Sequence, residues 1–398
     1  MLKIISRVFL VVGYIFSIIQ PLAANAELSE DNNLLWKKRI PGVFEESSSI
    51  NIDESMILVA NKEGDLYLFD EEGKMLWQKR FSEEYKKRVI YTAAAISNKN
   101  YVAISLAFDD YTNKLLIFNS QQRLIGEFEG RGGPQFSADG RYLLVIPDAD
   151  EAGELEIWKI SENKVGKVWE SGPWQTFFAV ISPHGKYVFT DSGTLYDVEK
   201  KEVLWRDVFW GHIGSHNNCF YVSESGQVMA GYLDERLLYF VTKEGVLRQA
   251  KLTTYPLAGA AISDDGKFVA TLEYKGKTEP ELIITSYDGE WGKYLWGRRL
   301  IKAYKNRLLP HVEMSSNGDY ILVSVSSESV SGENVFLMNN SGEIVQKLRI
   351  DCPVETVVTW PDDKKRIWRI LGRKINSTVS PPYAEIYLFE YSLKEEED

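Results

Sequence analysis

The chain contains little cysteine and little histidine. Its 398 residues include two Cys and four His, and Cys219 and Cys352 lie far apart in the sequence. Two cysteines cannot form a disulfide framework or a four-Cys zinc site, and the Gly-x-Ser-x-Gly elbow of serine hydrolases is absent. Whether the two cysteines pair stays open, because spacing alone cannot show that their Cα atoms lie within bonding distance.

Long apolar runs are missing after the first 26 residues. Within that segment, Lys3 and Arg7 flank the start of the apolar run 8–19, and the small-residue motif Ala-Asn-Ala follows at 24–26. This order is typical of a secretory signal peptide that is cleaved after the motif, and the run is short for a membrane span of roughly 20 residues. We therefore predict a signal peptide over 1–26 and a periplasmic or secreted mature chain without a transmembrane segment.

The chain has fewer basic than acidic residues. The chain has 46 Lys and Arg against 57 Asp and Glu, a net charge of −11. This excess of anions excludes binding to nucleic acid or anionic lipid through the general field of the protein. The acidic loop 147–154 contains Asp148, Asp150 and Glu154 but lacks the spacing of a full calcium loop. We interpret that loop and the acidic tail 394–398 as solvated surface and predict no metal.

One short stretch of sequence recurs many times along the chain. "ISDDGKFVAT" (262–271) resembles "ISPHGKYVFT" (181–190) and "FSADGRYLLV" (136–145), and further copies lie along the chain. Their centres are about 40 to 52 residues apart, a period typical of β-propellers. Glycine supplies the positive φ of the central turn. Two further runs rich in β-branched and aromatic residues follow each copy, which makes four short strands per unit, or one blade. His184 stands where other turns carry Asp, and we assign it no role.

Eight such units can be counted, and the last lacks a fourth strand. The N-terminal segment "LLWKKRIPG" (34–42) copies the fourth-strand segment "MLWQKRF" (75–81), so it can complete the last blade and remove a sheet edge. We predict an all-β fold: a single β-propeller domain over 27–398 with eight four-stranded blades, closed by 34–42. The alternative is seven blades, with 353–393 as an appendage. The predicted blades span about 48–82, 90–128, 133–170, 174–209, 217–252, 257–300, 308–350 and 353–393.

Tryptophan recurs at one place, late in the fourth strand of the blades. The set is Trp36, Trp77, Trp169, Trp205 and Trp296. A ligand-stacking box would use a few blades, whereas this position recurs around the ring. We therefore interpret the set as packing between blades.

The fourth-strand segments resemble the tryptophan-docking repeats of the quinoprotein, or PQQ-like, propeller superfamily. "DGEWGKYLW" (288–296) keeps the Asp, Gly, Lys and Trp of that pattern, "DVEKKEVLW" (197–205) keeps Asp and Trp, and "DEEGKMLW" (70–77) is one residue short. The hairpin turns are more similar to those of WD40-type and lactonase-like propellers. The resemblance implies the fold alone, because propellers host many activities.

The chain departs from several propeller families. Quinoprotein dehydrogenases typically carry a vicinal disulfide, and this chain has no adjacent cysteines, so we expect no cofactor. The chain is also similar in fold to the outer-membrane assembly propeller of Gram-negative bacteria, but the lipidated Cys of that family is missing.

The loops between blades contain the candidate binding residues. In a propeller these loops share one face with the loops between second and third strands, and function usually lies on such loops. The candidates are Arg131, Trp174, Trp210, His212, His216, Tyr255 and His311. The loops between second and third strands are acidic. A basic, aromatic centre inside an acidic rim suits a peptide carboxylate, a sugar or a protein loop.

Metal binding by the histidines is the weaker hypothesis. His212 and His216 are four residues apart, a spacing that serves a metal only on a helix, and Gly214 indicates a loop. We predict an exported, monomeric, non-catalytic propeller that binds an envelope or extracellular protein or a small ligand. The alternative is a lactonase-like or metal-assisted hydrolase in which His212, His216 and His311 converge.

Overall fold

The computed structural model describes most of the chain from Asn33 onward. The described residues are 33–42, 44, 50–52, 56–97, 99, 101–119, 121–129, 132–146, 155–161, 164–170, 179–206, 218–232, 237–253, 257–276, 281–289, 292–302, 310–325, 332–352, 354–359, 367–376 and 380–393. The signal peptide and the acidic tail lie outside them and stay predictions.

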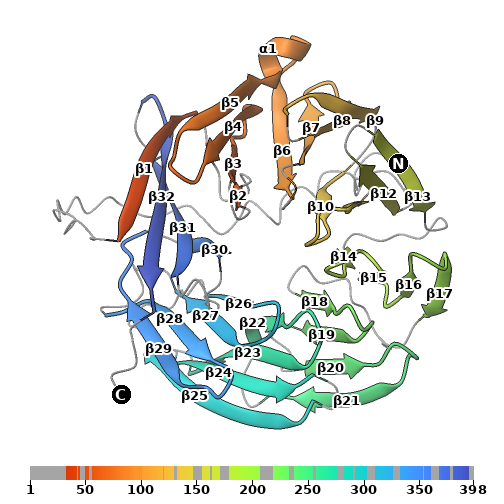
Figure 1. The fold of residues 1–398 in the computed structure, drawn as a ribbon, viewed down its shortest axis with the longest axis vertical. Coiled ribbons are helices and arrows are strands. Elements are labelled where there is room, and N and C mark those ends of the chain that lie inside the picture. Colours follow the sequence, from red (N-terminus) through yellow and green to blue (C-terminus); the bar gives the residue numbers. More distant parts are fainter. Residues whose placement is uncertain are drawn as a thin grey trace, which may run out of the picture. The chain divides into compact units, whose positions relative to one another are not determined.

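The described strands form eight four-stranded antiparallel sheets arranged as the blades of a ring (Figure 1). Blades 1 to 4 contain β2 (Ile50–Ile52), β3 (Met56–Ala60), β4 (Asp65–Asp70) and β5 (Met75–Arg80); β6 (Val89–Ile96), β7 (Val102–Phe108), β8 (Asn113–Phe118) and β9 (Leu124–Glu129); β10 (Pro134–Phe136), β11 (Tyr142–Val145), β12 (Glu156–Ser161) and β13 (Lys164–Glu170); and β14 (Ala179–Ile181), β15 (Tyr187–Thr190), β16 (Leu195–Asp197) and β17 (Glu202–Trp205). Blades 5 to 7 contain β18 (Asn218–Val222), β19 (Val228–Tyr232), β20 (Leu237–Val241) and β21 (Leu247–Leu252); β22 (Leu257–Ile262), β23 (Phe268–Lys275), β24 (Glu281–Asp288) and β25 (Tyr294–Lys302); and β26 (His311–Met314), β27 (Tyr320–Ser324), β28 (Val335–Asn339) and β29 (Ile344–Leu348).

Blade 8 joins the two ends of the described chain. It consists of β30 (Val354–Thr359), β31 (Ile367–Asn376), β32 (Tyr383–Ser392) and, as its outer strand, β1 (Leu34–Pro41). Residues from Trp36 to Pro41 pair antiparallel with Leu388 to Tyr383. The predicted eight-bladed ring with its N-terminal closing strand is confirmed. The seven-blade alternative is wrong, because 353–393 supplies three strands of a full blade.

The inner strands of each blade are buried on both faces. In β3, Met56, Leu58 and Ala60 pack against blade 2, whereas Ile57 and Val59 pack against blade 8. Strands covered on both faces need no polar alternation, and all five positions of β3 are accordingly apolar. Full burial of one such Leu or Ile side chain contributes about 1.5 to 3 kcal/mol. Eight apolar clusters result, one between each pair of neighbouring blades.

A β-bulge interrupts the fourth strand in every blade. In blade 1, Leu68 pairs with Trp77 and Phe69 pairs with Met75, so Leu76 has no partner residue. The same shift between third and fourth strands occurs in all eight sheets. The unpaired residue turns outward, and Leu76 is 38% exposed. Each tryptophan of the set directly follows the bulge, whatever its distance from the end of the strand.

Three tryptophans lie on a glycine of the following blade. The pairs are Trp36 on Gly73, Trp205 on Gly245 and Trp296 on Gly342. A Cβ added to Gly342 would lie 2.6 Å from the indole of Trp296, and the φ of +83° at this glycine is itself unfavourable for other residues. The Trp296 Nε1–H donates to the carbonyl of Asn340 at 2.7 Å. The turn of one blade thus holds the tryptophan of its neighbour.

Three blades lack the tryptophan, and the structure describes what fills its position in two of them. In blade 2 the position is Gly126, and the ring of Phe128 folds over it, 2.7 Å from where a Cβ would be. In blade 7 it is Gln346, whose Oε1 accepts a hydrogen bond from Trp368 Nε1 in blade 8 at 3.0 Å. In these two blades an aromatic side chain from another residue, Phe128 or Trp368, contacts the position that lacks the tryptophan.

The segment between the predicted blades 48–82 and 90–128 is not a simple loop. It contains α1 (Phe81–Tyr85), the single helix among the described residues, and the first residues of β6. Phe81 is fully buried between the two blades, and Glu83 and Glu84 lie in the first turn, where negative charge favours a helix N-terminus.

Two other features bear on the predictions from composition. Across the residues described, no helix is long and apolar enough to cross a membrane. Cys352 is buried between blades 7 and 8 beside Trp368 and Ile370, while the side chain of Cys219 lies outside those described, so a disulfide between the two stays open.

Candidate functional site on the loop face

The loop face is the face of the ring on which one blade passes to the next and second strands pass to third strands. Its best described part lies where blade 1 passes to blade 2. There α1 and residues 86–88 meet the loop 109–112 between β7 and β8. The backbone N–H of Asp109 donates to the carbonyl of Arg88 at 3.0 Å. An inter-blade segment and a hairpin loop therefore lie side by side, as the propeller topology requires.

Lys87 is the electrostatic centre of this contact. Its Nζ lies 2.6 Å from Oδ2 of Asp110, donates to Oγ1 of Thr112 at 3.2 Å, and is 5.5 Å from the centroid of the Phe108 ring. The hydroxyl and the N–H of Thr112 also donate to Asp110, at 2.5 and 3.2 Å. The bond from Lys87, reinforced by Thr112, lowers the pKa of Asp110 to about 2. The ion pair between Lys87 and Asp110 thus holds the loop 109–112 at neutral pH, and we call this loop the clamped loop.

Tyr111 stands at the tip of the clamped loop. Its side chain is 91% exposed, and its backbone has a φ of +63°. A non-glycine residue in this region costs about 1 to 3 kcal/mol, so its neighbours must hold it there. The N–H of Tyr111 donates to the carbonyl of Phe108 at 3.0 Å, and the Lys87–Asp110–Thr112 contacts close the loop around it. A large aromatic ring is presented to solvent on an ordered loop, an arrangement typical of recognition.

Tyr85 holds α1 against the same hairpin. Its ring packs edge-on against Phe108 with centroids 5.4 Å apart, and Nζ of Lys114 lies 5.1 Å from the ring centroid. The Tyr85 hydroxyl donates to Oε1 of Glu127 at 3.4 Å. Burial, with the charges of Glu127 and Glu84, raises the pKa of Tyr85 to about 12. The phenol therefore stays a neutral hydrogen-bond donor that fixes the helix.

Most of the candidate binding residues from the sequence fall outside the described residues. These are Arg131, Trp174, Trp210, His212, His216 and Tyr255. His311 is described: it opens β26, is 41% exposed, and its Nε2 lies 2.7 Å from Oε1 of Glu313. The convergence of the set stays a prediction. Within the described part of the chain, no three His, Cys, Asp or Glu side chains are grouped to hold a metal ion.

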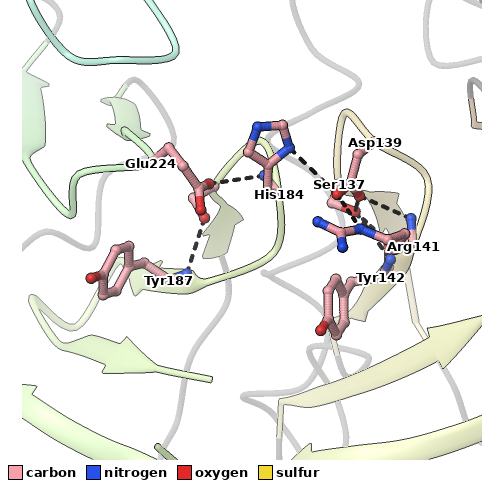
Figure 2. A network of polar contacts seen from close by, with 8 residues as sticks. Ser137, Asp139, Arg141, Tyr142, His184, Tyr187 and Glu224 are labelled. Carbon is pink, nitrogen blue, oxygen red and sulfur yellow. Dashed lines mark hydrogen bonds and ion pairs between the residues drawn. The ribbon is translucent and has the colours of Figure 1, made fainter. Parts of the chain in front are cut away.

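The opposite face, which we call the turn face, carries the hairpins between first and second strands. Figure 2 shows successive hairpins of this kind in contact. In blade 3, Oγ of Ser137 donates to Oδ1 of Asp139 at 2.8 Å and accepts the N–H of Tyr142 at 3.0 Å. The N–H of Asp139 donates to the carbonyl of Pro183 in blade 4 at 3.1 Å. The repeated Ser-x-Asp-Gly turn thus closes itself and binds the next turn.

His184 connects three blades on the turn face. Its Nδ1 lies 3.4 Å from Oδ2 of Asp139 in blade 3, and its backbone N–H donates to Oε2 of Glu224 in blade 5 at 2.9 Å (Figure 2). Burial raises the pKa of Asp264 in blade 6, while Ser316 and His184 act in the opposite direction. Sequence reasoning assigned His184 no role, and its departure from the repeat is the signal that marks it.

Sequence reasoning also passed over the two central residues of the described loop face. It placed Lys87 in a basic inter-blade loop and Tyr111 in an acidic hairpin loop, but singled out neither. The basic loop between blades 1 and 2 and the acidic loop between β7 and β8 are adjacent on the loop face. Their opposite charges are the sequence signal from which an ion pair between Lys87 and Asp110 could have been predicted.

Known structures resemble this chain in fold. No family model and no curated protein sequence matches it. The crystal structure of BamB from Moraxella catarrhalis aligns with a TM-score of 0.54 and 12% identity, over 89% of this chain and 99% of that one. Quinohemoprotein alcohol dehydrogenase ADHIIG from Pseudomonas putida HK5 gives 0.54 and 9%, over 89% and 76%. The C-terminal WD40 domain of Sif2 gives 0.51 and 12%, over 88% and 96%. The chain is therefore an eight-bladed β-propeller whose fold is similar to that of these three propellers, a likeness of fold and not of activity.

Proposed function

We propose that the protein is an exported, non-catalytic propeller that binds a protein or a small ligand through its loop face. The observation that carries this proposal is the clamped hairpin loop: Tyr111 is almost fully exposed in a conformation that Lys87 and Asp110 hold. The backbone of Tyr111 is already held, and a Tyr side chain has only two rotatable bonds, so binding costs little conformational entropy, which favours affinity. The predicted aromatic and cationic residues of the neighbouring inter-blade loops would extend the same surface.

Site-specific crosslinking in the native envelope tests the proposal. A photoreactive amino acid replaces Tyr111 in one variant and Tyr294 in the control. Tyr294 is 54% exposed on the outer strand β25, away from the loop face. We expect position 111 to capture a specific protein that position 294 does not. The purified partner should then bind the wild type more tightly than a variant carrying Trp210→Ala, His212→Ala and His216→Ala.

Two results would contradict the proposal. Equal capture from both positions would mean that the loop face has no special role. Turnover of an envelope substrate that the triple variant abolishes would instead support the lactonase-like or metal-assisted hydrolase, in which His212, His216 and His311 hold the reacting group. A small ligand would be recognised by protection of the same loops without any protein captured.

A further inference from the structure

A groove of about 580 Å³ runs between blade 8 and blade 1 on the side wall of the ring. We call it the junction groove. One wall is β1, and the other is formed by β4, β5 and the turn between them. Its floor is apolar: Ile40 and Tyr67 are 2% and 4% exposed, and Phe69 is 5% exposed. The Tyr67 hydroxyl reaches the carbonyl of Pro41 at 3.5 Å across the two blades.

The rim of the junction groove is cationic. Lys38, Arg39, Lys74 and Arg80 line it, and no carboxylate does. Arg39 is 3.5 Å from Glu385 and Arg80 is 3.1 Å from Glu83, but both arginines are more than half exposed. Among the described residues, Lys38 and Lys74 have no carboxylate within ion-pair distance. Two of the four rim cations, Lys38 and Lys74, therefore have no neutralising carboxylate among the described residues.

The next junction, between blades 1 and 2, shows the contrast. There Lys79 lies 3.2 Å from Glu84, and Lys114 forms an ion pair with Glu127. The outer strands of blades 3 and 6 likewise pair their cations within the blade, as Lys167 does with Glu170 and Arg299 with Glu281. A local excess of positive charge on a chain of net charge −11 indicates an anionic occupant.

The strands that line the groove have open outer edges. Within the described residues, β1 pairs with β32 alone and β5 pairs with β4 alone. Met75, at the start of β5, is 51% exposed at the groove. A peptide added along β5 would satisfy its edge and point every second side chain toward the groove. Apolar side chains could then contact Met75 and Phe69, and acidic ones could reach Lys38 and Lys74.

We infer that the junction groove binds an extended acidic peptide segment of a partner protein, laid along β5. A peptide fits better than an anionic membrane, because the apolar floor is recessed and the net charge of the chain repels an anionic surface. This surface lies on the side wall and is separate from the loop face, so the inference does not depend on the proposed function.

Fluorescence anisotropy with the full-length mature protein tests the inference. The probe is a labelled eight-residue peptide that alternates Glu and Val, with peptides alternating Lys and Val or Glu and Ser for comparison. The test variant is K38E/K74E, and K38Q/K74Q is its neutral form. The control K164E/K347E makes the same charge change at exposed lysines on β13 and β29. Urea midpoints establish that each variant is folded.

We expect the Glu–Val peptide to bind the wild type and to bind K38E/K74E about tenfold more weakly, because two attractions become repulsions. The affinity of K38Q/K74Q should fall between those of the wild type and K38E/K74E. The affinity of the control K164E/K347E should lie within about twofold of the wild type. The Lys–Val peptide should not bind, and the Glu–Ser peptide should bind more weakly.

Three outcomes would overturn the inference. The first is that the Glu–Val peptide does not bind the wild type. The second is that K38E/K74E and K164E/K347E weaken peptide binding equally. The third is that the protein does not bind the peptide but binds phosphatidylglycerol vesicles in a way that depends on Lys38 and Lys74.

Discussion

At the scale of single residues, the glycines beneath Trp36, Trp205 and Trp296 are positions where a larger residue does not fit. Gly342 combines a φ of +83° with an indole 2.6 Å from its missing Cβ. We expect Gly342→Ala to destabilise the protein by about 1 to 3 kcal/mol, because the turn and Trp296 must both shift. Gly166 in β13 has nothing within 4 Å of its Cβ position, so Gly166→Ala should change stability by less than about 0.5 kcal/mol. Urea unfolding of both variants measures the difference.

Asp110 is a residue whose titration should make the stability of the protein depend on pH. Its folded pKa, about 2, lies below its ordinary value of 3.8, so its contribution to stability is present above pH 3.8 and is lost as the pH falls through 2. We expect Lys87→Met to raise the pKa of Asp110 toward 3.8, since the first cause of the shift is removed. NMR titration of the Asp110 carboxyl carbon would report it, and an unchanged midpoint would show that Thr112 alone holds the carboxylate.

Residues of the turns could be predicted from the sequence, whereas their contacts could not. The Asp-Gly and Ser-Gly pairs marked the turns because few residues accept a positive φ. That Trp296 covers Gly342 depends on the position of the next blade, which lies more than forty residues away in the chain. His184 and Lys87 were passed over for the same reason: their partners belong to other hairpins.

At the scale of elements, β1 is the strand on which ring closure depends. Its Trp36 is 9% exposed and donates its Nε1–H to the carbonyl of Glu71 in blade 1 at 2.9 Å. Arg369 of blade 8 pairs with the side chain of Glu71 across the same junction. A docked indole and an ion pair thus hold the last blade against the first at this junction.

Replacing the closing tryptophan should destabilise the ring strongly. We expect Trp36→Ala to cost about 3 to 5 kcal/mol, because it removes a buried indole and leaves the space over Gly73 unfilled. The adjacent Leu35 is 44% exposed at the bulge, so Leu35→Ala should cost less than about 1 kcal/mol. Chemical denaturation of the two variants provides the comparison. Equal losses would mean that the strand pairing, and not the indole, holds the junction.

The strands were predictable as elements, and α1 was not. The repeat period and the strand-like runs indicated four strands per blade, and β1 was recognised as a copy of a fourth strand. The helix is five residues long and has no side-chain N-cap, so its sequence carries little local signal. Burial of Phe81 between two blades stabilises it instead.

At the scale of the whole molecule, the predicted signal peptide over 1–26 can be tested through the location and mass of the protein. Intact mass measurement of the protein from the extracytoplasmic fraction should show a chain that begins at Glu27. Ala24→Arg should prevent cleavage, because the small-residue motif is required, whereas Asn25→Gln should not. A full-length mass in that fraction would mean that the segment 1–26 remains as an anchor.

The sequence by itself determined the repeat and the all-β class, and it predicted eight blades and the closing strand, because strand period, turn glycines and copied segments are local properties of the chain. The tertiary structure alone decided which tryptophan covers which glycine, how Lys87 clamps the Tyr111 loop, and where unmatched cations gather beside β1. Each of these depends on the distance between side chains from different blades, and that distance is set by packing around the ring.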